Sequence, residues 1–387
     1  MTTLGFTAIV KNEAGVIERA LDSVRSLCDY VLISDTGSED GTPEVIRAWL
    51  QRNGVAGDVM ERPWVDFSYN RNEAIEALRG VSHVDYVLTI DADEYLVFDP
   101  GFDPEVFKAS LTSADAWRVV SRVDSYKFNR LQLFSNRLPF RFVQKMHEYV
   151  QTPEGTRIAT ATGFFNQYTY DGARMRNPTK YLDDALVMEA EFAAGGYDDP
   201  VRRPRGVYYL AQCYRDAKYL EKARDLYLER TTMGGSRDEI AWSYYNAALL
   251  MKRLDQPDEQ IIATHLKAYE AGPNRAEPLC LAAQLANLNH WHQQAYMFSK
   301  IAADLREPDV MLLDSAVYEW RALDELQVAA IGTGRFGEAV EIAERLLSEA
   351  KFPESERQRI EQNAAYALAQ YELAPVIGPD AASGLAN

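Results

Sequence analysis

The feature that most constrains the fold is a regular alternation of short apolar runs and amphipathic stretches in the first 91 residues. The apolar runs lie at residues 5–10, 29–35, 57–63 and 84–91, and the amphipathic stretches at residues 14–27, 41–54 and 70–80. Short apolar runs are typical of buried strands, and apolar positions that recur every three or four residues are typical of helices. This order predicts an α/β domain with a mostly parallel sheet that helices cover on both faces.

Acidic residues stand where two of these predicted strands end. In sheets of this kind, ligands bind beyond the carboxyl ends of the strands, so we expect Asp35 and Asp91 to lie along one edge. Asp91 and Asp93 are two residues apart, and on an extended backbone their side chains would share a face. Carboxylates in such a place suit Mg²⁺ or Mn²⁺, which take one or two of them together with substrate phosphates. A solvated acidic turn that caps the strand is the competing interpretation.

Three further motifs fall at the same predicted edge. Residues 11–13 ("KNE") follow the first strand, and residues 35–42 ("DTGSEDGT") lead from the second strand into a helix, with Thr42 as the expected N-cap. Asn70 and Arg71 begin a helix, where backbone N–H groups and a guanidinium could meet a diphosphate. Each motif alone also suits an ordinary helix start or a surface ion pair.

A histidine and a glutamate stand side by side in "QKMHEYV". Glu148 could act as a general base, and His147 could bind a metal or a phosphate. A strand that happens to expose one of the two is the alternative. The chain has neither G-x-G-x-x-G nor G-x-x-x-x-G-K, which counts against a dinucleotide-binding domain and against a P-loop.

Composition narrows the functional classes. A net charge of −17 argues against a general nucleic-acid binder. Three scattered cysteines form neither a disulfide framework nor a zinc motif, which suggests a reducing compartment. No apolar run approaches the ~20 residues that span a bilayer, and the first residues lack the apolar core of a signal peptide. We therefore expect a soluble, cytoplasmic protein without a transmembrane segment.

The second half of the chain has a helical period throughout. Residues 204–375 resemble a series of helical hairpins, in which Ala223, Ala295 and Ala339 occupy equivalent small positions of tetratricopeptide-like repeats. We expect most aromatic rings of this region to pack between helices. The predicted domains are thus residues 1–171, a linker helix and turn at 172–203, an all-α repeat domain at 204–375 and a flexible tail at 376–387.

Taken in order, five segments of the first half resemble a family 2 glycosyltransferase of the GT-A fold. These segments are "IVKNEAGVIERALDSV", "DYVLISDTGSEDGT", "FSYNRNEA", "YVLTIDADEYL" and "VQKMHEYV". The helical half is similar to the tetratricopeptide-type extensions of a bacterial subgroup whose members glycosylate peptides, proteins or lipopolysaccharide cores.

The resemblance implies inverting transfer from a nucleotide-diphosphate sugar, usually a UDP-sugar, with Mn²⁺ or Mg²⁺ as cofactor. Carried over by motif, Val10, Asn12, Glu13 and Asp35 would line the nucleobase and ribose. Arg71 would lie near the nucleotide or the diphosphate.

The same resemblance assigns the metal and the base. Asp93 would bind the metal directly, Asp91 would face the ribose or the metal, and His147 is a further candidate ligand. Glu148 stands where related enzymes place the catalytic base, although many of them have Glu-Asp where this sequence has His-Glu. Where many relatives have an aromatic residue that stacks on the base, this sequence has Lys11.

Two other functional classes fit parts of the pattern. In one, the repeats form a scaffold that binds a partner protein, and the α/β half is inactive. In the other, the chain is a nucleotidylyltransferase, but that class has a glycine-rich loop with a basic residue that "AIVKNEAG" lacks. An enzyme whose repeats hold a peptide, protein or glycan acceptor, or mediate homodimerisation, is the interpretation that the sequence favours.

Overall fold

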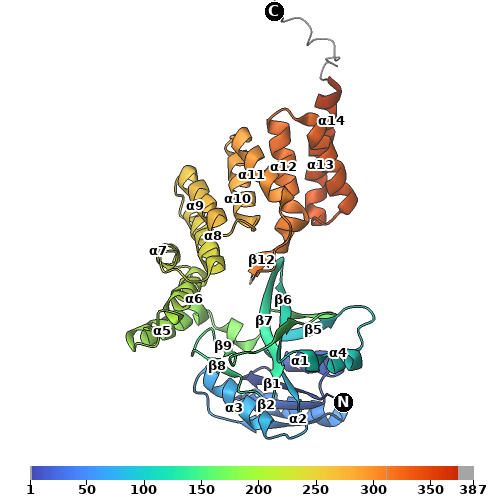
Figure 1. Cartoon of the computed structure of the whole chain (residues 1–387), viewed down its shortest axis with the longest axis vertical. Helices are drawn as coiled ribbons and strands as arrows, with labels where there is room; N and C mark the ends of the chain where they lie inside the picture. Colours follow the sequence, from blue (N-terminus) through green and yellow to red (C-terminus); the bar gives the residue numbers. More distant parts are fainter. Residues whose placement is uncertain (1, 311, 374–387) are drawn as a thin grey trace, which may run out of the picture. The chain divides into compact units, whose positions relative to one another are not determined.

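A single curled, mostly parallel sheet organises the N-terminal part of the computed structural model, which describes residues 2–310 and 312–373 (Figure 1). Its strands run in the order β3-β2-β1-β4-β7-β6-β11-β5, and β10 pairs with β6. The first four strands in this order are mutually parallel, whereas β7 is antiparallel to both β4 and β6. The bounds are β1 (Leu4–Val10), β2 (Tyr30–Asp35), β3 (Ala56–Glu61), β4 (Tyr86–Thr89), β5 (Glu94–Phe98), β6 (Ala116–Val123), β7 (Tyr126–Ser135), β10 (Ile158–Thr160) and β11 (Phe164–Tyr168), with β8 (Arg141–Val143) and β9 (Tyr149–Gln151) in a separate pair. The α/β class with a mostly parallel sheet is therefore confirmed.

Helices cover both faces of this sheet. Successive side chains of β1 point to opposite faces, so the strand contributes to a hydrophobic core on each side. Leu4 and Phe6 join one hydrophobic core with α1 and α2, whereas α3 packs on the opposite face with Val87 and Phe134. On that face a Cβ at Gly5 would lie 2.8 Å from Val84, so glycine lets α3 and its loop approach the strand closely. The helices are α1 (Ile17–Val24), α2 (Thr42–Asn53), α3 (Phe67–Arg79), α4 (Pro104–Ser110), α5 (Lys180–Ala193) and α6 (Arg202–Asp216), with 3₁₀ turns η1 (Leu111–Ser113) and η2 (Ala173–Arg176).

The start of α2 differs from the expected one. Gly41, with φ of 85°, is the N-cap, and Thr42 is the first helical residue. The Thr42 hydroxyl accepts a hydrogen bond from the backbone N–H of Glu13 at 2.9 Å, so it joins two loops and does not cap its own helix. The helix ends at Asn53, and Gly54 takes the left-handed C-cap conformation with φ of 63°.

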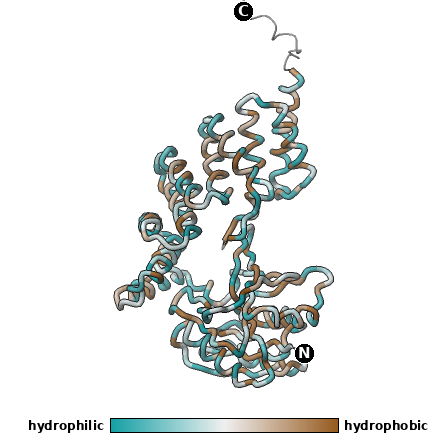
Figure 2. Tube along the Cα trace, in the orientation of Figure 1, coloured by the Kyte–Doolittle hydropathy of each residue, from teal (hydrophilic) through white to brown (hydrophobic). Residues whose placement is uncertain are grey.

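The remaining elements are almost all helical, as the sequence predicted. They are α7 (Leu220–Arg230), α8 (Arg237–Arg253), α9 (Asp258–Ala271), α10 (Glu277–Leu288), α11 (His292–Asp304), β12 (Leu312–Asp314), the π-helix η3 (Val317–Arg321), α12 (Ala322–Gly332), α13 (Phe336–Glu349), the 3₁₀ turn η4 (Glu354–Glu356) and α14 (Arg357–Leu373). Ala223, Ala295 and Ala339 are all fully buried, which fits equivalent contact positions in three of the hairpins. Apolar and polar residues alternate along these helices in Figure 2, and the rings of Trp242 and Tyr245 are buried as expected.

The chain divides into two compact units. The first comprises the residues up to Tyr219 together with Val310–Leu312, and the second comprises Leu220–Asp309 and the residues from Leu313 on. Helices α5 and α6 thus fall within the first unit. The finer division at residues 171 and 203 stays a prediction, and the predicted tail at 376–387 lies outside the described residues.

Candidate functional site

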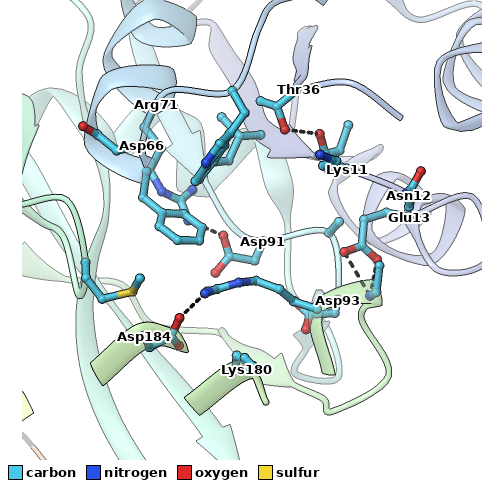
Figure 3. Close-up of a pocket in the computed structure, with 18 of the residues that line it drawn as sticks. Lys11, Asn12, Glu13, Thr36, Asp66, Arg71, Asp91, Asp93, Lys180 and Asp184 are labelled. Carbon is cyan, nitrogen blue, oxygen red and sulfur yellow. Dashed lines mark hydrogen bonds and ion pairs between the residues drawn. The ribbon is translucent and has the colours of Figure 1, made fainter. Parts of the chain in front are cut away.

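A pocket of about 600 Å³ lies at the carboxyl ends of the parallel strands in the first unit. The ends of β1, β2 and β3 are in register, since Val10 pairs with Asp35 and Asp35 pairs with Glu61. The residues that follow these strands and β4 line one part of the pocket, and the segment after β11 lines another (Figure 3). The predicted edge therefore forms the wall of a cavity. The lining residues used below are Val10, Lys11, Asn12, Glu13, Thr36, Trp64, Val65, Phe67, Arg71, Asp91, Asp93, Arg174, Lys180 and Asp184.

Asp91 and Asp93 both line this pocket, but the backbone between them is not extended. Strand β4 ends at Thr89, and the N–H of Glu94 donates to the carbonyl oxygen of Asp91 at 3.0 Å, which closes a turn. Contrary to the expectation from the sequence, Asp91 and Asp93 do not share a face of an extended strand. The two carboxylates reach one cavity because the chain turns between β4 and β5.

Arg71 joins two of the predicted site carboxylates. Its side chain is only 8% exposed, with Nη2 2.5 Å from Oδ1 of Asp91 and Nε 2.7 Å from Oε1 of Glu148. Burial opposes the ionisation of Asp91, but Arg71 and Arg130 outweigh it and lower the Asp91 pKa to about 2. Asp91 is thus held as a fixed anion that faces the pocket.

A buried polar network behind Asp91 was not anticipated from the sequence. Glu94 is fully buried and accepts hydrogen bonds from Arg130, from Asn166 at 2.7 Å and from the backbone N–H of Asp91 at 3.1 Å. The partners lie on β7 and β11, 36 and 72 residues away. Only the position of Glu94 within an acidic run hinted at a role, because nothing local in a sequence specifies such distant pairings.

Asp93 lies in a strongly negative environment. Burial, followed by the charges of Asp91, Glu94 and Glu13, raises the Asp93 pKa to about 7. A divalent cation would relieve this repulsion, so the donor chemistry of Asp91 and Asp93 fits a site completed by substrate phosphates. Among the residues that the structure describes, no group of three or more His, Cys, Asp or Glu side chains could hold a metal by itself.

The loops after β1 and β2 are tied together by the motifs singled out above. The N–H of Asn12 donates to Ser38 Oγ, and Asn12 Oδ1 accepts from the N–H of Glu39, both at 2.8 Å. Asp35 Oδ2 accepts from the N–H groups of Gly37 and Ser38, so this carboxylate holds its own turn. Val10, Asn12 and Thr36 line the pocket, whereas Asp35 is buried beside it and is not one of the lining residues.

His147 and Glu148 lie in the loop between β8 and β9 and not on a strand. The His147 ring stacks on Tyr209 with centroids 4.3 Å apart, and its Nε2 is 3.2 Å from Sγ of Cys213. Burial, then the charges of Arg205, Arg174 and Lys180, lower the His147 pKa to about 3. The structure therefore places His147 against α6 and Glu148 beside Arg71, and neither is among the pocket-lining residues.

The segment after β11, assigned above to a linker, supplies cations to the pocket. The Arg174 guanidinium lies 4.7 Å from the Phe67 ring centroid and pairs with Asp184. Lys180 also lines the pocket, and burial and the nearby Arg174 lower its pKa. The basic run "GARMRNPTK" was visible in the sequence, but nothing there indicated that it folds back over the strand ends. The Glu13 carboxylate fixes this return, because it accepts from the Ala173 N–H at 3.0 Å.

Parallel strands that end at a pocket with paired carboxylates and facing cations are typical of α/β domains that bind phosphorylated ligands. Residues 8–169 match the family model described as "Glycosyl transferase family 2". The first unit therefore contains a domain that matches the family 2 glycosyltransferase model, and a helical region similar to tetratricopeptide repeats follows it.

Two curated relatives match parts of the chain. A TPR repeat-containing protein of Synechococcus elongatus is 28% identical over 189 residues, which cover 46% of this chain and 44% of that protein. An uncharacterized glycosyltransferase of Rickettsia bellii is 33% identical over 88 residues, which cover 23% of this chain and 26% of that protein. The chain thus spans less than half the length of either relative.

Among solved structures, the mannosyltransferase PcManGT from Pyrobaculum calidifontis, in complex with GDP-Man and Mn²⁺, has a TM-score of 0.39 at 15% identity, covering 78% of this chain and 85% of that chain. A tetratricopeptide repeat protein from Parabacteroides merdae has a TM-score of 0.35 at 16% identity, covering 52% of this chain and 77% of that chain. In the described part of the chain, no helix is both long and apolar enough to cross a membrane.

Proposed function

We propose that the chain is a metal-dependent inverting glycosyltransferase. It moves a sugar from a nucleotide-diphosphate sugar, with UDP-sugars as the first donors to test, to a peptide, protein, saccharide or lipopolysaccharide-type acceptor in the cytoplasm. The observation that carries the proposal is the meeting of Asp91 and Asp93 with Arg174 and Lys180 at one pocket in a family 2 glycosyltransferase domain.

Acidic and basic residues of the pocket have different proposed roles. Asp93, with Asp91 beside it, would hold Mn²⁺ or Mg²⁺, which when bound supplies positive charge that stabilises the departing diphosphate. Arg174 and Lys180, which line the same pocket, would bind the diphosphate oxygens. Figure 3 shows Lys180 on the segment that follows β11. Arg71 would act indirectly, by holding the carboxylates of Asp91 and Glu148 in position.

Inversion requires one displacement at the anomeric carbon. The acceptor oxygen forms the new bond while the bond to the diphosphate breaks, and a base takes the acceptor proton. We assign this base to Glu148, which the Arg71 Nε holds at 2.7 Å in the loop between β8 and β9. Asp184 is the competing carboxylate, because it lines the pocket and burial raises its pKa.

Release of nucleoside diphosphate tests the proposal. The full chain is incubated with a panel of nucleotide sugars in Mn²⁺ and in chelator, and we expect cation-dependent release from at least one donor. Asp93→Ala should reduce the rate at least 100-fold, whereas Asp99→Asn, an exposed carboxylate after β5, should not change it. If no donor binds or is hydrolysed and Asp93→Ala has no effect, the inactive-scaffold alternative holds.

The identity of the base is tested separately. Glu148→Gln should reduce transfer to an acceptor about 100-fold or more while leaving donor affinity within about twofold. Full transfer by Glu148→Gln, with a large loss in Asp184→Asn, would move the assignment to Asp184.

A further inference from the structure

An exposed tryptophan lines the pocket. Trp64 follows β3, lines the cavity and is 44% exposed, and the adjacent Val65 is 52% exposed. Ligand pockets use aromatic rings as flat apolar surfaces and place polar groups beside them to fix orientation. The exposed indole therefore offers a surface for a planar ligand group.

The backbone around Trp64 is held rigidly. Asn70 is fully buried, and its Nδ2 donates to the carbonyl oxygen of Pro63 at 3.0 Å while its Oδ1 accepts from the N–H of Val65 at 2.9 Å. One amide thus fixes the residues on both sides of Trp64. The indole also makes an edge-to-face contact with Phe67, with centroids 4.8 Å apart. An aromatic ring that is ordered before binding loses little entropy when a ligand stacks on it.

The position of Trp64 along the strand ends indicates which part of a ligand it would meet. The adjacent strands β3, β2, β1 and β4 form the wall, so β3 and β4 are three strand spacings apart, or about 14 Å. Asp91 and Asp93 follow β4, at the opposite end from Trp64. A nucleoside diphosphate whose charged end lies near β4 would place its base toward β3.

We propose that the indole of Trp64 is the surface on which the nucleobase of the donor stacks. The inference rests on the proposed function, since it needs a nucleotide whose diphosphate lies near Asp93. Stacking on an aromatic face recognises every base, so the indole would add affinity without selecting one nucleotide. A sugar ring of the acceptor is the other occupant that could use this surface, and the experiment separates the two.

Calorimetric titrations with UDP, GDP and inorganic pyrophosphate, each with Mn²⁺, test the proposal. Trp64→Ala should weaken UDP and GDP binding about 5-fold to 100-fold, the range for loss of one base–aromatic stack, and should leave pyrophosphate binding within about twofold. Trp64→Phe should retain most of the affinity. Tyr69→Ala, at a 52% exposed ring on α3 outside the pocket lining, is the matched control and should change neither ligand.

The outcomes distinguish this inference from the proposed function. If the parent protein binds neither nucleotides nor pyrophosphate, both fail together. If it binds both, and Trp64→Ala weakens them equally or not at all, only the stacking assignment is wrong. Unchanged UDP affinity with a raised KM for an acceptor would assign the indole to the acceptor and would also overturn the proposal. Retained pyrophosphate binding shows that the variant pocket is folded.

Discussion

Two neighbouring aspartates at the pocket differ sharply in their surroundings. Asp91 contacts Arg71 and Arg130, which lower its pKa to about 2, whereas burial and the charges of Asp91, Glu94 and Glu13 raise the Asp93 pKa to about 7. The protein thus stabilises the ionised form of Asp91, whereas ionising Asp93 costs free energy. This difference supports Asp93 as the residue whose charge an added cation would neutralise.

The first prediction concerns the stability of the cation-free protein. A raised pKa means that the folded state binds the Asp93 proton more tightly than the unfolded state does. The contribution of protonated Asp93 to the free energy of unfolding is therefore fully present below about pH 4, and it is lost as the pH rises through about 7. Asp93→Asn removes this loss and should be more stable than the parent at pH 8 by on the order of 1–2 kcal/mol. Thermal unfolding in chelator between pH 4 and 8 measures the difference.

A cation should act in the opposite direction. Mn²⁺ should stabilise the parent protein at pH 8 and have little effect on Asp93→Asn, because the variant lacks the charge that binds it. The exposed Asp99→Asn should follow the parent at every pH. A stability difference between the parent and Asp93→Asn that does not change between pH 4 and 8 would contradict the assigned environment of Asp93.

At the scale of elements, the site depends on loops that are tied to one another. The loops after β1 and β2 are joined through Asn12 and Thr42, and Glu13 holds the segment that begins at Ala173. Gly172 directly precedes that segment, and a Cβ added to it would be 2.6 Å from Oδ2 of Asp93. Gly172 therefore lies so close to the Asp93 carboxylate that a side chain at position 172 would collide with it.

The second prediction tests this approach. Gly172→Ala should displace the Asp93 carboxylate. The Mn²⁺-dependent rate of nucleoside diphosphate release should then fall about 10-fold or more, because catalytic sites tolerate misplacements of less than about 1 Å. Gly15→Ala is the matched control, since its nearest neighbour is an Arg176 nitrogen at 4.0 Å and neither glycine has a positive φ. Equal metal dependence in both variants would show that Asp93 can move without consequence.

The periodicity of the sequence was sufficient to predict helices and strands in the first 91 residues, but not the contacts that the residues at their ends make. The first four strands, the helices between them and the edge that forms the pocket were predicted, because burial imposes a period that a single sequence displays, whereas strands β5, β6, β7, β10 and β11 were not. The turn between Asp91 and Glu94, and the use of Thr42 to bind a neighbouring loop, were not. Both depend on which residues lie across the loop in space.

The same limit explains what was missed in the site. Arg130 binds Glu94 from 36 residues away, and Arg174 reaches a pocket formed by strands more than 80 residues earlier. Neither residue lies in a motif, since the fold alone brings them to the strand ends. Asp91 and Asp93 were found because their spacing and their place after an apolar run are local features of the sequence.

At the scale of the whole molecule, two compact units of different architecture share one chain. The pocket and every residue assigned to it belong to the first unit, while the second is an array of helices with small buried residues such as Ala295. In helical repeats each hairpin is stabilised chiefly by its neighbours. The units should therefore respond separately to a ligand that binds only one of them.

The third prediction is that calorimetric unfolding of the full chain shows two transitions, only one of which responds to ligand. At 100 times the Kd, Mn²⁺ with UDP should raise the transition of the first unit by about 5–10 °C. Ala295→Leu, which overpacks a fully buried position of α11, should lower only the other transition, since such changes cost about 1–3 kcal/mol. A single transition moved by both the ligand and Ala295→Leu would mean that the repeats and the pocket unfold as one. In that case, an occupant of the repeats would change the stability of the donor site even without touching it.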